Sequence, residues 1–163
     1  MKNARFISLF FLITLMAACA STEQYAPFPD QGKMVEDPSK GRIYVMRPTL
    51  FGCAISMDVL DGGSKIGKTG PGGYLCWERE PGSTIITGKA ENTASLSIDV
   101  KPGSVTYIHQ GVRMGIVYAR NVLELMGEAK GQGELADCDP PRGCSLQANP
   151  VASPETKQEA GPE

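Results

Sequence analysis

The chain is built from short runs of β-forming residues that glycine and proline interrupt at short intervals. Between residues 41 and 138 these runs read RIYVMR, AISMDVL, YLCWERE, STIITGKA, SLSIDV and SVTYIHQGVRM. The turn sequences DGG, GPGG and, twice, PG lie between them. In SLSIDV, Leu96, Ile98 and Val100 alternate with Ser97 and Asp99, which is the period of a half-buried strand. The pattern predicts a mainly β fold.

Two further features narrow this fold to a small antiparallel β-sandwich. A parallel α/β sheet needs long helical crossovers, whereas the only helical stretch is residues 127–137, which Gly131 and Gly133 weaken. The remaining β-rich runs, residues 115–120 and 122–126, add strands. A segment of roughly 100 residues is enough for one core. We therefore expect one β-sandwich domain over residues 41–138, with a short helix at its C-terminal side.

One stretch imitates a nucleotide-binding motif. Residues 62–69, GGSKIGKT, match G-x-x-x-x-G-K-[ST] in full. A P-loop needs a helix to begin at its last two residues, but here Gly-Pro-Gly-Gly follows Thr69 and a helix cannot continue. A hairpin explains the stretch better, because Asp61, Gly62 and Gly63 form a turn with positive φ between two strands. We therefore expect no nucleotide partner.

The N-terminus indicates export. Lys2 and Arg5 precede an uncharged, largely apolar run over residues 6–16, which is too short to span a bilayer and typical of a signal peptide. The run ends in LMAAC, which resembles the lipobox of bacterial lipoproteins. This resemblance implies that residues 1–18 are removed and that Cys19 carries lipid through its thiol and its amine. Three acyl chains would anchor the protein stably in a membrane.

Cleavage at an A-x-A site is the alternative, and it would release a soluble periplasmic protein after Ala20. Ala20, rather than Asp, follows the lipidated cysteine, and the likeness to lipoproteins of enteric bacteria then implies the outer membrane, on its periplasmic side. Removal of Lys2 and Arg5 with the signal peptide changes the net charge from −2 to −4. This mild acidity argues against nucleic acid and anionic lipid head groups as main partners, so the lipid must provide the anchor.

Four more cysteines follow, and their even number in an oxidising compartment predicts two disulfides. Three pairings are possible for Cys53, Cys76, Cys138 and Cys144. We favour Cys53–Cys76 and Cys138–Cys144 because each pair closes a local loop. By loop-closure entropy, the two disulfides would stabilise the folded state by about 3 and 2 kcal/mol. A zinc site is the alternative, but the chain has no C-x-x-C pair and one histidine. We expect no metal and no cofactor.

The segments on either side of the β-rich region differ from it in composition. Residues 19–40 contain three prolines, mixed charge and no sustained periodicity, which predicts a lipidated tether that holds the domain off the membrane. Residues 139–163 contain five prolines with Gln, Glu, Asn and Ala, which predicts a tail that is disordered beyond Cys144.

Several motifs spread over residues 40–137 resemble the bacterial family called domain of unknown function 2846. They are an R-I-Y-V-x-R strand, a V-x-D-G-x-x-x-G hairpin, a P-G-x-T strand start and a late V-x-M-G. The resemblance implies an exported, often lipidated β-sandwich, and the hairpin with its P-G turn is also similar to PEGA-type surface domains. The family name implies no activity, and the four cysteines are not part of its pattern.

Several other polar and aromatic residues could have either a functional or a purely structural role. His109 lies in a strand next to no Ser or Cys motif, so it is expected to be a packed or edge histidine rather than a catalytic base. Trp77 and Tyr74 could form an aromatic binding platform, but a tryptophan beside Cys76 more often packs in a core against a disulfide. The ERE triplet at residues 78–80 is read as a solvated strand end.

The remaining acidic and hydroxyl residues add no motif. Asp58, Asp61 and Asp99 are read as scattered carboxylates without calcium-loop spacing. Ser97 and Ser104 lie near His109 in sequence, but no nucleophile elbow is present. The sequence therefore predicts a membrane-anchored binding or structural module of the cell envelope, with a protein or the cell wall as its ligand and with no catalytic residue. An envelope hydrolase is the alternative from another class.

Overall fold

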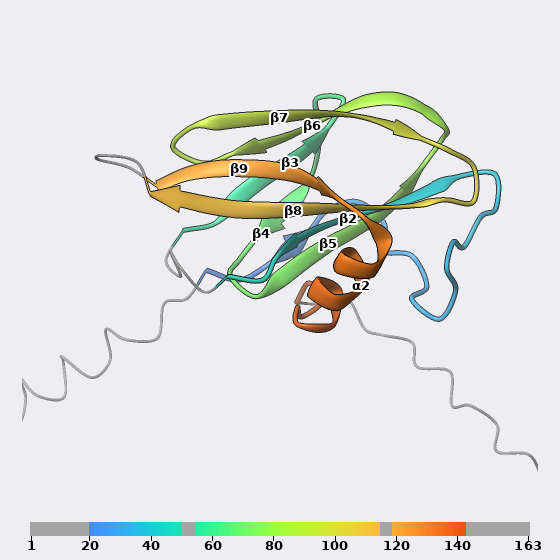
Figure 1. The fold of residues 1–163 in the computed structure, drawn as a ribbon, viewed down its shortest axis with the longest axis horizontal. Helices are drawn as coiled ribbons and strands as arrows, with labels where there is room; N and C mark the ends of the chain where they lie inside the picture. The colour runs from blue at the N-terminus through green and yellow to red at the C-terminus, as the bar shows by residue number, and fades with distance from the viewer. Residues whose placement is uncertain (1–19, 50–54, 115–118, 143–163) are drawn as a thin grey trace, which may run out of the picture.

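The computed structural model describes residues 20–49, 55–114 and 119–142, which form two packed sheets and one helix (Figure 1). The first sheet has the order β1-β4-β3-β6-β7, with bounds Glu23–Gln24, Ser64–Thr69, Met57–Asp61, Gly82–Lys89 and Thr93–Val100. The second has the order β5-β2-β8-β9, with bounds Gly73–Arg79, Gly41–Arg47, Val105–Met114 and Ala119–Met126. The helix is α2, Glu128–Ala136. The prediction of a small, mainly β sandwich is confirmed.

The strand pairs of the described chain are antiparallel with one exception, which the sequence did not predict. β2 and β8 lie side by side and run in the same direction, with Met46 opposite His109. The connection between them is long enough for a parallel pair because it contains four strands, β3, β4, β6 and β7, of the other sheet, as well as β5. The strand predicted at residues 115–120 enters the description only at Ala119, as the beginning of β9.

The sheet that contains β2 is buried on both faces, so its strands read as nearly continuous apolar runs. One face packs against the other sheet and forms the inner core of the sandwich, with Ile43, Val45, Leu75, Trp77, Ile108, Val59 and Ile86. The opposite face forms an outer core, with Tyr44, Met46, Tyr74, Cys76, Tyr107 and Met126. All seven residues of β2 are buried, which includes the two arginines at its ends.

Helix α2 and the N-terminal segment cover this outer core (Figure 1). Leu135 of the helix and Phe28 of the N-terminal segment both pack against it. Gly131 lies against the ring of Tyr107, where a Cβ atom would overlap the ring carbons. The glycine that lowers helix propensity therefore lets the helix approach the sheet closely.

Residues 20–40 are folded against the domain, which differs from the free tether that their composition predicts. β1 extends the first sheet by pairing with β4. The side-chain amide of Gln24 binds the edge of β5, donating to the Cys76 carbonyl at 2.6 Å and accepting from the Cys76 N–H at 2.9 Å. Asn92 binds the outer edge of β9 in the same way through the N–H and carbonyl of Asn121. Both edges of the second sheet thus have their backbone groups partly occupied by amide side chains.

The two ends of the described chain meet at one end of the sandwich, which we call the terminal end. Ala20 lies against Gly70, whose Cβ would overlap the Ala20 carbonyl. The N–H of Arg142 donates to the carbonyl of Thr22 at 3.2 Å. The opposite end, which we call the far end, is formed by the turns after β3, β5 and β7. Residues 139–142 of the tail are ordered here, and the part predicted to be disordered, beyond Cys144, lies outside the described residues.

The stretch that imitates a P-loop is a hairpin, as predicted. β3 and β4 pair directly through the Asp61–Ser64 turn, and Gly62 and Gly63 have φ of 55° and 91°. No helix follows Thr69. Lys68 is on β4 and forms an exposed ion pair with Glu23 of β1, 3.1 Å between the charged atoms.

We expect Lys68→Ala to change the free energy of unfolding by less than about 0.5 kcal/mol, because exposed ion pairs contribute little. Gly62→Val and Gly63→Val should each cost about 1–2 kcal/mol, because a β-branched residue resists positive φ. Urea denaturation measures both. Stabilisation by Mg²⁺-ATP that disappears in Lys68→Ala would contradict the hairpin interpretation of this stretch.

Candidate functional site

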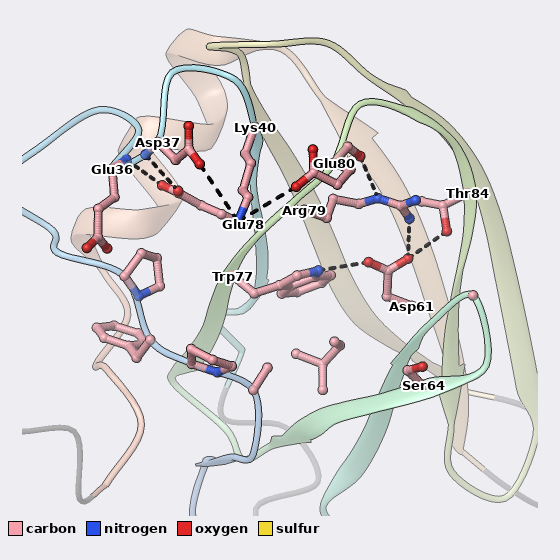
Figure 2. Close-up of a pocket in the computed structure, with 16 residues that line it drawn as sticks. Glu36, Asp37, Lys40, Asp61, Ser64, Trp77, Glu78, Arg79, Glu80 and Thr84 are labelled. Carbon is pink, nitrogen blue, oxygen red and sulfur yellow. Dashed lines mark hydrogen bonds and ion pairs between the residues drawn. The ribbon is translucent and has the colours of Figure 1, made fainter.

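A cleft with a volume of about 880 Å³ lies at the far end of the sandwich (Figure 2). Four parts of the chain line it. They are residues 26–29, 36, 37 and 40 of the N-terminal segment, residues 77–80 around the end of β5, the β3–β4 turn with Ile66, and Thr84 of β6. The floor is largely apolar, with Ala26, Pro27, Phe28, Ile66 and Trp77, and the rim carries charged side chains.

Asp61 organises one side of the cleft. Its carboxylate accepts hydrogen bonds from Trp77 Nε1 at 2.9 Å, Arg79 Nη1 at 2.6 Å and Thr84 Oγ1 at 2.6 Å (Figure 2). Asp61 is the last residue of β3, where the hairpin turn begins, so its side chain reaches the neighbouring ends of β5 and β6. Because three donors already bind this carboxylate, its role is to fix the positions of Trp77 and Arg79.

A buried ion pair holds the opposite wall. Arg42 is fully buried, and its Nε and Nη2 donate to Glu78 Oε1 at 3.0 and 2.7 Å. The same carboxylate accepts the backbone N–H groups of Glu36 at 2.6 Å and Asp37 at 3.1 Å. Glu78 therefore joins a strand of the sheet to the loop that forms the cleft wall.

Arg42 also holds residues 25–40, which we call the strap. Its Nη1 donates to the Lys33 carbonyl at 2.7 Å, and its Nη2 donates to the Asp30 carbonyl at 3.0 Å. Tyr44, which is next on the same face of β2, donates to Gln31 Oε1 at 2.8 Å. The strap has little regular structure of its own, so these side chains of β2 determine its path.

The environment of Glu78 favours its charged form. Burial alone would raise its pKa, but the N–H of Glu36, the guanidinium of Arg42 and the N–H of Asp37 together hold the pKa below the ordinary value of 4.5. A carboxyl group whose pKa is lower in the folded state than in the unfolded state stabilises the folded protein. This stabilisation is complete at pH values above the unfolded-state pKa, and it is lost as the pH falls through the folded-state pKa.

The rim of the cleft is exposed and mostly acidic. Lys40 lies between Asp37 and Glu80, with charged-atom distances of 3.8 and 3.7 Å (Figure 2). The Glu80 side chain is 74 % exposed. Such exposed pairs are weak and rearrange easily, so the rim can exchange its partners for those of a ligand.

The ERE triplet is therefore only partly the solvated strand end that the sequence suggested. Glu80 is exposed as expected, but the side chain of Glu78 is 9 % exposed and Arg79 is bound to Asp61. Asp61 was expected to be one of several carboxylates without a shared role, whereas its side chain joins the ends of three strands by hydrogen bonds. The signal that could have revealed Glu78 is Arg42, a charge at the start of an otherwise apolar strand, which needs a buried partner.

The aromatic platform that Trp77 and Tyr74 could form is absent. The Trp77 side chain is 3 % exposed and belongs to the inner core, whereas Tyr74 faces the outer core. The core position of Trp77 is as expected, but its packing against a disulfide of Cys76 is wrong. Neighbouring residues of a strand point to opposite faces, so Trp77 and Cys76 lie on opposite sides of the sheet.

The cysteine predictions fall largely outside the described residues. Cys19, Cys53 and Cys144 all lie there, so lipidation at Cys19 and the pairs Cys53–Cys76 and Cys138–Cys144 stay predictions. Cys76 and Cys138 are free thiols in the structure. Burial raises the pKa of both thiols to about 11, so neither is a thiolate nucleophile at neutral pH.

The residues considered for a hydrolase are not brought together. His109 Nδ1 lies 2.7 Å from Glu134 Oε2 of α2, on the outer face of the second sheet. Ser97 is exposed on β7 of the other sheet, and the hydroxyl of Ser104 donates to the Lys101 carbonyl within a turn. Asp58 and Asp99 lie on the first sheet, where Asp58 pairs with Lys65.

Within the described part of the chain, no group of three or more His, Cys, Asp and Glu side chains could hold a metal ion. No helix among the same residues is long and apolar enough to cross a membrane. Comparison of the chain with family models, with curated proteins and with solved structures found no match. The resemblance to domain of unknown function 2846 thus stays a prediction.

Removal of either partner of the Arg42–Glu78 pair should be costly, because it leaves a buried charge without its counter-ion. We expect Arg42→Met and Glu78→Gln each to lower the free energy of unfolding by about 3–5 kcal/mol. The double variant should lose less than the sum of the two, since it buries no unpaired charge. Urea denaturation of the four proteins measures this coupling, and strictly additive losses would contradict it.

The same proteins test the pH dependence. Wild-type stability should fall as the pH drops below about 4.5, where the unfolded chain takes up the proton that folded Glu78 resists. Glu78→Gln has no carboxyl group to titrate at this position, so its stability should fall less steeply over the same range. Equal slopes would show that Glu78 does not contribute.

Proposed function

We propose that the chain is a lipid-anchored protein of the bacterial cell envelope and that its β-sandwich is a non-enzymatic binding or structural module. The lipid on Cys19 would hold it in the outer membrane, facing the periplasm. The cleft at the far end would receive the ligand, an envelope protein or a part of the cell wall. The signal peptide and lipobox pattern support the anchor, and the position of the cleft supports the binding role.

The observation that carries this proposal is the placement of the cleft relative to the N-terminus of the fold. Ala20, the residue after Cys19, is packed at the terminal end against Gly70. The cleft is at the far end, where β5 finishes at Arg79. β5 runs from one end to the other, and a strand of its length spans about 20 Å. A membrane at Cys19 would therefore leave the cleft open to the periplasm.

The chemistry of the cleft fits a binding role. Its floor offers proline and aliphatic surface, and its rim offers exposed charges and backbone groups, which together suit an extended polar ligand such as a peptide or a glycan. The buried polar groups of the cleft are committed to one another, as Asp61 and Glu78 show. They give the site a fixed shape, and this shape supports recognition rather than proton transfer.

The anchor is tested by growing cells with a clickable fatty acid and fractionating their envelopes. We expect label on the wild-type protein in the outer-membrane fraction and no label on Cys19→Ser, which lacks the acceptor thiol. An unlabelled wild-type protein in the soluble periplasmic fraction would contradict the anchor and support cleavage at the A-x-A site.

The binding role is tested by a photo-crosslinking amino acid at Ser64, which lines the cleft, in living cells. The matched control carries the same group at Ser97, which is also exposed but lies on β7 outside the cleft. We expect an adduct of defined mass from position 64 that Glu80→Lys weakens, since it reverses a rim charge. Equal adducts at both positions, or none at position 64, would contradict a ligand in the cleft.

A further inference from the structure

The β8–β9 hairpin projects beyond the rest of its sheet at the terminal end (Figure 1). Met46 lies opposite His109, so the last residue of β2, Arg47, is level with Gln110. β8 continues for four residues past that level, to Met114. At about 3.3 Å per residue the hairpin extends roughly 13 Å past the end of β2.

Two arginines face each other near the outer part of this hairpin. Arg113 of β8 and Arg120 of β9 are directly opposite in the register, so their side chains leave the same face of the sheet. Like charges in this position destabilise a strand pair. Arg113 is 72 % exposed and bonds Glu124 at 2.6 Å, whereas the side chain of Arg120 has no partner among the described residues. The fold therefore keeps an unneutralised positive charge at this tip.

A third arginine lies at the same end. Arg142 is exposed, and its N–H binds the Thr22 carbonyl two residues from Ala20. Five acidic side chains line the cleft at the far end: Glu36, Asp37, Asp61, Glu78 and Glu80. Arg42, Arg79 and Lys40 lie beside these carboxylates and pair with Glu78, Asp61 and Glu80, so the charge of the far end is largely neutralised.

We propose that Arg113, Arg120 and Arg142 dock the terminal end on the phosphate groups of an anionic phospholipid surface. This inference rests on the proposed anchor for its orientation, because the lipid on Cys19 would emerge at the same end. The guanidinium groups bind phosphate oxygens in pairs of hydrogen bonds, and the projecting hairpin brings two of them to the surface first. The arginines and the proposed lipid on Cys19 act at the same end of the domain, so together they would orient it upright on the membrane.

The test uses residues 20–163, which lack both the signal peptide and the lipid acceptor Cys19, so that its outcome does not depend on acylation. Co-sedimentation at low ionic strength compares vesicles of phosphatidylcholine alone with vesicles that also contain phosphatidylglycerol. We expect binding to the anionic vesicles only. The double variant Arg113→Gln/Arg120→Gln should lower the partition coefficient roughly 25-fold, about fivefold for each arginine.

The matched control neutralises two cations away from the terminal end, Lys33→Gln/Lys101→Gln, which changes the net charge by the same amount. This control should bind as the wild type does. Equal binding to both kinds of vesicle, no binding to either, or an equal loss in the control would overturn the docking surface. Inorganic phosphate at millimolar concentration should not displace the protein, and full displacement would assign the arginines to a soluble anion instead. A failed fatty-acid labelling experiment would remove the anchor without changing any of these results.

Discussion

The ion pair between Arg42 and Glu78 joins three parts of the chain that are separate in sequence: the strap, β2 and β5. The strap forms almost no regular structure, so its path depends on side-chain contacts such as this ion pair and the Tyr44–Gln31 hydrogen bond. The strap in turn forms one wall of the cleft and covers the outer core around Tyr44. Burying an ion pair yields little net stability, but losing one partner is expensive. The pair therefore acts mainly to select one path for the strap.

Amide side chains solve a related problem at the edges of the same sheet. Gln24 occupies the backbone groups of Cys76, and Asn92 those of Asn121. Each amide offers a donor and an acceptor in the arrangement of a neighbouring peptide group, so it ends the ladder without adding a strand. The N-terminal segment thus contributes in two ways, by pairing through β1 and by blocking an edge that another chain could otherwise extend.

Local features of the sequence were sufficient to predict most of the strands and turns, but not β1, which lies in the predicted tether. The alternation around Leu96 and the two glycines after Asp61 each depend on a few neighbouring residues, and both were interpreted correctly. The strap and the cleft were not predicted, because they depend on partners far apart in sequence. Arg42 and Glu78 are 36 positions apart, and neither residue reveals its partner in a single sequence. The prolines of the strap suggest a flexible linker, whereas the structure holds them by contacts that composition does not encode.

Ala20 packs against Gly70, so the proposed lipid anchor on the residue before it would join the folded domain without a linker. A lipoprotein with a long flexible linker searches a wide volume, and the effective concentration of its binding site falls with linker length. With no linker, a cleft about one strand length above the lipid surface would sample a thin layer of nearly constant height. Encounters would then be almost two-dimensional. A partner held in the same layer would meet the cleft often, whereas a partner deeper in the periplasm would have to extend a segment of its own to reach it.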